Sequence, residues 1–486
     1  MQQLCSRRSA LRVALAPLVA SLTFVALEAS AQPFSVRGPG LAPVAFEVTT
    51  FASGLAFPSS MQQLADGSLI VLTTAPNGLW GSSEGRILRL VDADGNGVAD
   101  GVPQQLASGL PAVATSLRIA GELVFVSAQQ HGSEGIHVLR MGTQPDAPYT
   151  WLGSMDFSFT VACPGNPSWV HPNNALAVRE LAGAPMTVEL YFNLGAETNL
   201  ETCGTVVAGG LLSGLPGANP IDADSIYRVR VTDSGGVPIV SQLEKIASGL
   251  RNAAGMAFHP ETGDLYFQDN AANTPPPGDF DEPLGADELN RIGADDLGGP
   301  VEDFGFPSDY VVYRLGGATA GTSLQPLVAF QPIPDPITGV ESEGPVEIAF
   351  APPGFPSELH GGIFVGFHGR FDLAGVANEE NPVVFADPTS GAYFHFIGND
   401  EPALGHPNGL LATDDALYVA DFSTTGTFGA ADFGAIYRIR MAQGVPALGP
   451  GARAALAVLL LVACAEPTAR RFVVLRAVED RRRSLQ

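Results

Sequence analysis

A short hairpin pattern recurs along this chain, and the recurrence limits the fold more than any other feature. The string Ala-Ser-Gly-Leu occurs three times, at 52–55, 107–110 and 247–250. Two short apolar segments separated by a turn follow each occurrence. In the third copy, Pro260 fixes φ and Gly263 is free to adopt a positive φ, so residues 259–264 suit a turn between two antiparallel strands. The pattern therefore predicts repeated strand–turn–strand units.

Less regular copies bring the number of units to six. They are 174–178 with 190–192, 346–350 with 362–365, and 408–412 with 416–419. Several copies precede a further segment in which arginines alternate with apolar residues: 85–90, 225–230 and 435–440. Units of a few short strands stack radially, so six of them predict an all-β, six-bladed β-propeller. A pair of β-sandwiches is the alternative, but it does not explain six similar hairpins.

The spacing of the units predicts long loops and a simple domain organisation. The units are more widely spaced than the roughly 40–50 residues of a usual blade. The expected loops are 142–170, 196–222, 271–287, 293–335 and 370–390. The domains are predicted to be a signal peptide at 1–31, a lead-in at 32–46, the propeller at 47–441 and a C-terminal segment at 442–486. Helix is expected only in the signal and the C-terminal segment.

The first residues have the composition of an export signal. Arg7, Arg8 and Arg12 precede an apolar run at 13–27 and the small residues 29–31. Residues 6–12 also resemble a twin-arginine signal, so both export routes remain open. The protein is expected in the periplasm, at the cell surface or outside the cell.

The C-terminal segment contains an apolar run at 454–465, followed by Arg470 and Arg471. This run is shorter than the ~20 residues needed to span a bilayer. The segment resembles the PEP-CTERM-like sorting signals of exported bacterial proteins, although Val-Pro-Ala-Leu-Gly-Pro stands in place of Pro-Glu-Pro. A plain hydrophobic anchor is the alternative. We expect a monomer that contacts a membrane only through this segment.

Charge excludes some classes of partner. The formal net charge is −25, which repels nucleic acid and anionic lipid and tolerates cations such as calcium. Lys245 is the only lysine, so any mechanism that needs a lysine must use it. Because export permits disulfides, we expect Cys163 to pair with Cys203; two buried thiols are the alternative.

Residues 92–100 form the best local metal motif. Asp92, Asp94, Asn96 and Asp100 place oxygen ligands at positions 1, 3, 5 and 9 of a calcium-type loop, with Gly97 at position 6. The usual glutamate at position 12 is replaced by proline, so the expected affinity is modest. An acidic turn without an ion is the alternative.

Residues 247–292 resemble the glucose/sorbosone dehydrogenase superfamily. The resemblance lies in Ser-Gly-Leu-Arg-Asn at 248–252, Gly-Met-Ala-Phe at 255–258, Asp-Leu-Tyr at 264–266 and Asp-Glu-Leu-Asn at 287–290. Characterised members of that superfamily are six-bladed propellers that bind pyrroloquinoline quinone and calcium. The resemblance implies a carbohydrate substrate, an aldose or polyol, and hydride transfer to the quinone.

The resemblance also implies roles for individual residues. Arg251 and Asn252 match a pair that contacts the quinone, and His171 matches the position of a histidine that acts as general base. His368 and Arg370 lie where part of the family has a cofactor-contacting lysine, so Arg370 would substitute for it. Asp287 and Glu288 belong to the matching motif and are candidate calcium ligands. Each residue also has a structural alternative, such as a salt bridge, a turn or a backbone contact.

Two other functions remain open. A non-catalytic, surface-displayed binding module agrees with the absence of the family lysine, and a calcium-dependent lactonase or esterase can use the same architecture. The polar residues Arg251, Asn252, Asp269 and Asn270 flank the third hairpin and are not repeated in the other copies. They are therefore predicted to carry function.

Overall fold

The computed structural model describes most of the chain between residues 32 and 442. The described residues are 32–75, 77–130, 133–159, 171, 175–181, 183, 184, 186–196, 198–200, 205–210, 220–274, 283–319, 321–333, 344–370, 373–429 and 433–442. The chain divides into two units, Met1–Gln32 and Pro33–Gln486, and every described strand lies in the second. The expected signal peptide, C-terminal segment, Cys163 and Cys203 lie outside the described residues.

The strands form six sheets, which are antiparallel except for one parallel pair at the edge of the third. We number the sheets as blades in chain order and name the strands of each blade from the inside outward. Blade 1 contains β2 (Ser60–Gln63), β3 (Leu69–Ala75), β4 (Glu84–Leu90) and β5 (Gln104–Leu110). Blade 2 begins with β6 (Ala114–Ala120), β7 (Leu123–Gln130), β8 (Ser133–Arg140) and β9 (Thr150–Phe159). Blade 3 contains β10 (Leu176–Glu180), β11 (Thr187–Leu194), β14 (Ser225–Thr232) and β15 (Ile239–Ser248).

The other three blades follow the same plan. Blade 4 contains β16 (Met256–Phe258), β17 (Leu265–Asp269), β18 (Asp287–Ile292) and β20 (Val328–Phe330). Blade 5 contains β21 (Pro345–Phe350), β22 (Ile363–Phe367), β23 (Val383–Ala386) and β24 (Tyr393–Ile397). Blade 6 contains β25 (Pro407–Ala412), β26 (Ala416–Asp421), β27 (Gly434–Met441) and β1 (Phe46–Leu55).

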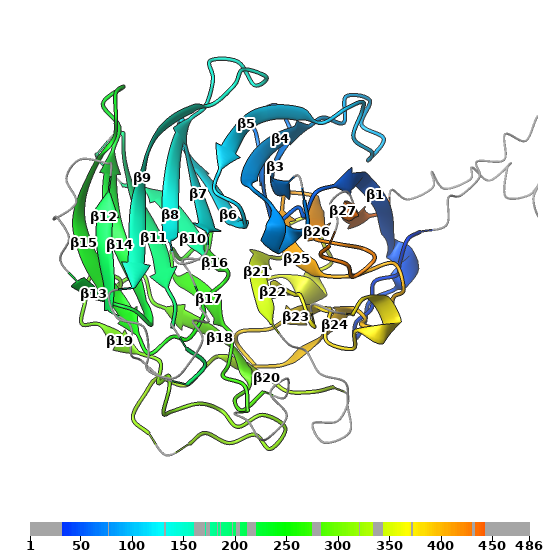
Figure 1. The fold of residues 1–486 in the computed structure, drawn as a ribbon. Coiled ribbons are helices and arrows are strands. Elements are labelled where there is room, and N and C mark those ends of the chain that lie inside the picture. Colours follow the sequence, from blue (N-terminus) through cyan, green and yellow to red (C-terminus); the bar gives the residue numbers. More distant parts are fainter. Residues whose placement is uncertain are drawn as a thin grey trace, which may run out of the picture. The chain divides into compact units, whose positions relative to one another are not determined.

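The innermost strands close into a ring, which confirms the six-bladed β-propeller. Strand β2 contacts β6, and the contacts continue through β10, β16, β21 and β25 back to β2. Strand β1, the first strand in the chain, is the outermost strand of the last blade, where it pairs with β27 (Figure 1). Since both ends of the propeller segment lie in one sheet, the closure is held by backbone hydrogen bonds.

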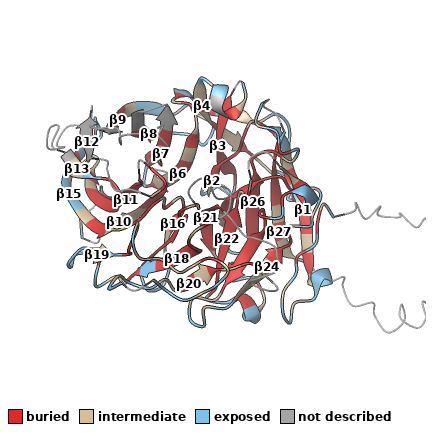
Figure 2. Ribbon diagram, turned by 60° about the horizontal axis from the view of Figure 1, so that its bottom comes forward, coloured by how far each residue is buried: buried red, intermediate tan, exposed pale blue. Residues whose placement is uncertain are grey.

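Alternation along the strands explains how the blades pack. In β27, Ile436 belongs to the apolar cluster shared with blade 1, whereas Tyr437 and Ile439 belong to the cluster shared with blade 5. Side chains of successive residues point to opposite faces of a strand. Each blade therefore buries both of its faces against its neighbours, and the buried residues follow the strands (Figure 2).

Several of the predicted long loops contain strands. Residues 142–170 include all of β9, and residues 196–222 include β12 (Thr205–Gly210) and β13 (Pro220–Asp222), which extend blade 2 beyond β9. Residues 293–335 contain β20 and β19 (Glu302–Asp303), and the latter pairs with β15 of blade 3. Outer strands lack the repeated hairpin sequence, but the open edge of a blade offers backbone groups for pairing.

Helix is scarce in the described part of the chain. It consists of four short 3₁₀ turns at Pro43–Ala45, Leu79–Gly81, Ser357–Leu359 and Gly375–Ala377. Among the residues that the structure describes, no helix has the length and apolar character needed to cross a bilayer.

Candidate functional site

Most of the predicted site residues lie at one end of the propeller, which we call the mouth. The mouth is the end at which the innermost strands begin. His171 precedes β10, Arg251 and Asn252 precede β16, and His368 and Arg370 follow β22 at the same end of blade 5. In an antiparallel blade, the start of the first strand and the end of the second lie together. The topology thus brings these predicted residues to one end.

His171 is held by the backbone of a neighbouring loop. Its backbone N–H donates to the carbonyl oxygen of Ala196 at 3.1 Å, and its Nδ1 lies 2.9 Å from the same oxygen. A carbonyl only accepts, so Nδ1 carries the proton and Nε2 is the basic nitrogen. Burial, together with the charge of Arg251, lowers the pKa of His171 to about 3. The imidazole is therefore neutral at neutral pH, the form that can accept a proton.

Arg251 is joined to His171 through the same loop. The backbone N–H of Ala196 donates to the carbonyl oxygen of Arg251 at 2.8 Å. A Cβ on Gly195 would lie 2.8 Å from the Cβ of His171 and 2.9 Å from the carbonyl oxygen of Arg251, so only glycine fits between them. Two residues that are distant in the sequence are thereby fixed side by side at the mouth.

The guanidinium of Arg251 is buried and donates to carbonyl oxygens. Its Nε and Nη2 lie 3.3 and 3.1 Å from the backbone and side-chain oxygens of Asn199, and its Nη1 lies 3.4 Å from the carbonyl oxygen of Asn270. The residue is 4% exposed. An anionic ligand that binds the guanidinium of Arg251 must therefore replace one or more of these hydrogen bonds to protein oxygens.

Asp269 has a structural role that the sequence interpretation missed. Its carboxylate accepts the backbone N–H groups of Arg251 at 3.0 Å and Asn252 at 2.6 Å. In blade 6, Asp421 occupies the corresponding position and accepts the N–H groups of the two residues before β25 at 2.7 and 2.8 Å. The prediction that the polar end of the third hairpin is unrepeated was therefore wrong for Asp269. The arrangement recurs because it satisfies the backbone of the loop entering an innermost strand.

Asp287 and Glu288 are buried beside this loop. The carboxylate of Asp287 accepts the N–H groups of Ala271 at 2.9 Å and Gly344 at 3.1 Å, and Glu288 accepts the side-chain amide of Asn290 at 3.1 Å. Burial raises the pKa of Asp287 to about 7 and that of Glu288 to about 8. Their role as calcium ligands stays a prediction.

His368 adjoins these carboxylates from blade 5. A Cβ on Gly344 would lie 2.3 Å from its Nε2, so the ring lies against the residue that donates to Asp287. The Nδ1 of His406, from blade 6, lies 2.5 Å from the carbonyl oxygen of His368. Arg370 holds a loop through its backbone, which exchanges hydrogen bonds with the amide of Asn378 at 3.2 and 3.1 Å. The mouth is thus lined continuously from blade 3 to blade 6.

An ion pair crosses the central channel beneath the mouth. Arg118 of β6 and Glu347 of β21 meet at 2.6 Å, and their side chains are 12% and 5% exposed. The same guanidinium lies 3.1 Å from the carbonyl oxygen of Met256 and 3.3 Å from the hydroxyl of Ser60. Four innermost strands are therefore joined across the ring. Sequence reasoning missed this pair because no local pattern connects residues of opposite blades.

Asp224 is a third feature that the sequence interpretation missed. It precedes β14 with φ of 55°, and its Oδ1 is buried with no hydrogen-bond partner. Its carbonyl oxygen accepts the N–H of Leu250, and the leucines that correspond to Leu250 in blades 1 and 6 face Gly85 and Gly434. A carboxylate at a position that other blades fill with glycine was the available signal. Burial and the nearby Asp269 raise the pKa of Asp224 to about 8.

We expect the free energy of unfolding to fall as the pH rises from about 7 to about 8.5, because the folded chain holds the Asp224 proton more tightly than the unfolded chain. A carboxyl group whose pKa is raised in the folded chain contributes its full stabilisation below its pKa in the unfolded chain, near 4. This stabilisation is lost as the pH rises through the pKa in the folded chain. The expected loss from this group is on the order of 1 kcal/mol. Urea denaturation at both pH values measures it. Asp224→Asn should reduce the dependence and leave the part that comes from Glu288, whereas the exposed-loop variant Asp146→Asn should leave the dependence unchanged. An equal slope in Asp224→Asn and the wild type would contradict the assignment.

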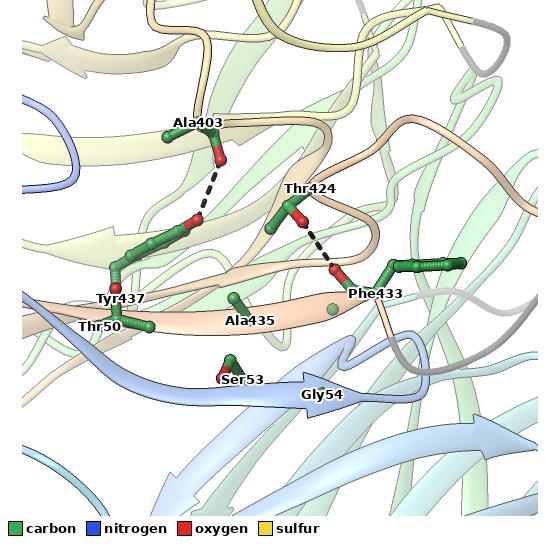
Figure 3. A pocket seen from close by; sticks show the side chains of 9 residues that line it. Thr50, Ser53, Gly54, Ala403, Thr424, Phe433, Ala435 and Tyr437 are labelled. Atoms are coloured by element: carbon green, nitrogen blue, oxygen red, sulfur yellow. Dashed lines mark hydrogen bonds between the residues drawn. The ribbon is translucent and has the colours of Figure 1, made fainter.

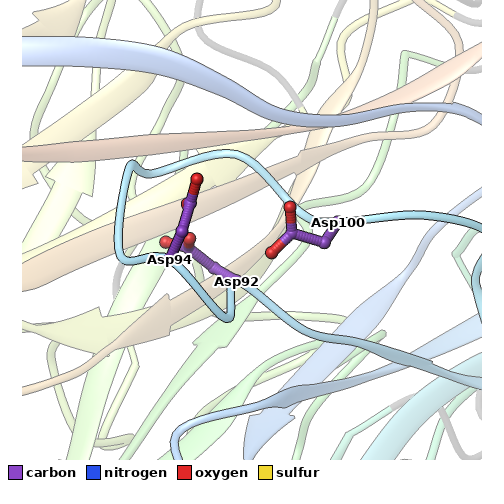
Figure 4. A group of neighbouring side chains, drawn as sticks. All are labelled: Asp92, Asp94 and Asp100. Carbon is purple, nitrogen blue, oxygen red and sulfur yellow. The ribbon is translucent and has the colours of Figure 1, made fainter.

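The predicted calcium loop lies at the end opposite the mouth. It follows β4, whose last residue Leu90 pairs with Leu69 at the start of β3. The carboxylates of Asp92, Asp94 and Asp100 lie within 4.8 Å of one another on this loop (Figure 4). Within the described residues this is the one such group of three acidic, histidine or cysteine side chains.

Asn96, which was predicted as a calcium ligand, makes hydrogen bonds within the loop. Its side-chain oxygen accepts the N–H of Val98 at 2.8 Å, and its amide nitrogen lies 2.9 Å from Asp94. It therefore shapes the loop beside the three carboxylates. Arg438 lies 3.7 Å from Asp92 and competes with a cation for that carboxylate.

Calcium is expected to stabilise the protein through this loop. With a dissociation constant of roughly 10⁻⁴–10⁻³ M, about 5 mM calcium adds about 1–2 kcal/mol to the free energy of unfolding. Thermal denaturation with and without calcium measures this effect. Asp94→Asn should remove it, and Asp415→Asn, which changes a carboxylate outside the group, should retain it. A calcium shift that persists in Asp94→Asn would exclude the loop as the site.

No family model matches the chain, and no curated protein is similar to it in sequence. Among solved structures, the chain is similar to the PQQ domain of a pyranose dehydrogenase from Coprinopsis cinerea, with 14% identity, coverage of 84% of this chain and 98% of that chain, and a TM-score of 0.49. It is similar to the calcium structure of a family AA12 carbohydrate-active enzyme from Trichoderma reesei, with 15% identity, 85% and 98% coverage, and a TM-score of 0.49. A glucose dehydrogenase has 15% identity, 81% and 98% coverage, and a TM-score of 0.48.

Proposed function

We propose that this chain is an exported, sugar-dehydrogenase-like propeller that oxidises an aldose or a polyol at the mouth. The observation that carries the proposal is the junction of His171 and Arg251 through Ala196. These are the two residues to which the sequence resemblance assigns the base and a cofactor contact. The basic and apolar start of the chain and its C-terminal run support export.

His171 is the proposed general base. Its Nδ1–H is engaged by the carbonyl oxygen of Ala196, which orients the ring and leaves Nε2 as the nitrogen that takes the hydroxyl proton of the sugar. Its low pKa makes it a weak base, but it also keeps the imidazole neutral and therefore able to accept a proton at neutral pH.

The donor set fits pyrroloquinoline quinone and calcium in kind. Arg251, Asn252 and Arg370 offer guanidinium and amide groups for anionic oxygens. Asp287 and Glu288 offer the carboxylate oxygens that calcium prefers, and their raised pKa values reflect buried acids that a cation would stabilise in charged form. When bound, the quinone would accept the hydride of the sugar.

A non-catalytic carbohydrate-binding module is the second candidate. The specific observation in its favour is the guanidinium of Arg251, which is buried and donates to Asn199 and Asn270. A calcium-dependent lactonase requires carboxylates that converge on one ion in the channel. In the described part of the chain, the group of three carboxylates lies instead at the opposite end.

Reconstitution tests the proposal. The purified mature protein is mixed with pyrroloquinoline quinone and calcium, and dye reduction is measured with a panel of aldoses and polyols. Sugar-dependent reduction that requires both additions supports the dehydrogenase. Absence of reduction with every sugar, alongside retained sugar binding, would support the binding module instead.

A further inference from the structure

A hollow of about 460 Å³ lies on blade 6 between β1 and β27 (Figure 3). Thr50 and Ser53 from β1, Tyr437 from β27, and Ala403, Thr424 and Phe433 from the adjoining loops line it. It lies toward the mouth end of the outer strands, where β1 ends and β27 begins. We propose that this hollow binds a neutral polyhydroxylated ligand, a sugar ring of about hexose size. The proposal does not depend on the oxidation proposed for His171.

Irregular pairing of β1 with β27 creates the hollow. The register shifts between Thr50 and Ala52 and again between Ser53 and Leu55. Gly54 has φ of 71°, and a Cβ placed on it would meet nothing within 4 Å. Bulges redirect side chains at the edge of a sheet. Here they leave the hydroxyls of Thr50 and Ser53 exposed on the edge strand.

The same Ala-Ser-Gly-Leu bulge has different neighbours in two other blades. In blade 1, the N–H of Gly109 donates to Glu84 at 3.1 Å, so a charged side chain lies beside the bulge, although a Cβ on Gly109 would meet nothing within 4 Å. In blade 3, β19 pairs with the end of β15, and a Cβ on Gly249 would lie 2.4 Å from the carboxylate of Asp303. Among these three related positions, the one in blade 3 is filled, the one in blade 1 is open beside a carboxylate, and the one in blade 6 is open beside neutral side chains.

Phe433 takes the place of the charged group in blade 6. Leu110 faces Gly85 in blade 1, and Leu55 faces Gly434 in blade 6, so Glu84 and Phe433 hold the same position, immediately before these two glycines. Phe433 is 41% exposed. Its ring extends away from Thr50 and Tyr437 in Figure 3, so it can offer an apolar face to the C–H groups of a sugar only at the rim of the hollow.

The polar groups of the hollow are neutral. The hydroxyl of Tyr437 donates to the carbonyl oxygen of Ala403 at 3.0 Å, and that of Thr424 donates to the carbonyl oxygen of Phe433 at 3.0 Å. Both oxygens retain acceptor capacity, and the hydroxyls of Thr50 and Ser53 can donate and accept. The described lining contains no Asp, Glu, Lys, Arg or His, although the chain carries a net charge of −25. This lining matches uncharged hydroxyl groups, since burying an unpaired charge is unfavourable.

Saturation-transfer NMR with the full-length protein tests the proposal. The probes are neutral hexoses and a hexuronic acid of the same size, and the variants are Phe433→Ala and Ser53→Val. We expect the neutral sugars to bind with preference over the hexuronic acid. Phe433→Ala should weaken the binding about two- to tenfold, the loss in affinity expected when one aromatic contact is removed. Ser53→Val should weaken it less.

Controls separate this site from the mouth. The control variant Val102→Ala removes an exposed apolar side chain at the end of the propeller opposite the mouth. This variant should bind the sugars with the affinity of the wild type. His171→Asn should retain binding at the hollow, and Phe433→Ala should retain dye reduction. Equal affinity of Phe433→Ala and the wild type, equal binding of the hexuronic acid, or no binding of any neutral sugar would overturn the proposal.

Discussion

Arg118→Met is expected to lower the free energy of unfolding by about 3–5 kcal/mol, because it leaves the buried carboxylate of Glu347 without its partner. The variant also removes the donors to the carbonyl oxygen of Met256 and the hydroxyl of Ser60. Since these groups belong to four blades, one substitution weakens the ring at several points. Equilibrium denaturation in urea or guanidinium measures the loss.

Two further variants make this test specific. The double variant Arg118→Met, Glu347→Leu replaces the pair with apolar groups and should recover most of the loss, as buried pairs often do. Arg86→Met breaks a pair whose side chains are 30% and 29% exposed and should cost only ~0–1 kcal/mol. A similar small loss for Arg118→Met and Arg86→Met would show that the channel pair contributes little.

His171→Asn is expected to lower the rate of sugar oxidation by about 10²–10⁴-fold, the usual contribution of a positioned general base. Asparagine can still donate to the carbonyl oxygen of Ala196, but it offers no basic nitrogen. Steady-state dye reduction measures kcat/KM and its dependence on pH. A base role predicts that the acidic limb of the pH profile disappears together with the rate, whereas a purely structural role lowers the rate without changing the profile.

His360 supplies the matched control for this variant. It lies in the turn after β21, at the end opposite the mouth, where its Nε2 lies 2.8 Å from the carbonyl oxygen of Phe355. His360→Asn should retain the wild-type rate. Equal rates for His171→Asn and the wild type would exclude His171 as the base.

The architecture was predictable because the information is local. Each hairpin and its turn lie within about twenty residues, and six similar hairpins allow few arrangements. The outer strands β12, β13, β19 and β20 were missed because their pairing depends on the edge of a blade that is formed by distant residues.

The candidate site was predictable only in part. Sequence comparison among the hairpins brought His171, Arg251 and His368 to one end, since the first two precede the first strand of a hairpin and the third follows the second strand. The comparison was wrong for Asp269. Its counterpart Asp421 lies in a different local sequence but accepts the corresponding backbone N–H groups of its own blade. Arg118, Glu347 and Asp224 act through contacts across the ring or between loops. Such contacts depend on three-dimensional proximity, which residue patterns do not encode.

Equilibrium titration of the purified mature protein with pyrroloquinoline quinone in the presence of calcium tests the central claim most directly. Quenching of intrinsic fluorescence reports binding without any need for turnover. A functional mouth predicts saturable binding at micromolar concentration that weakens at least about tenfold in Arg251→Met, because the guanidinium contact to an anionic oxygen is lost. Absence of saturable binding, or equal affinity in the wild type and Arg251→Met, would contradict the assignment of the mouth.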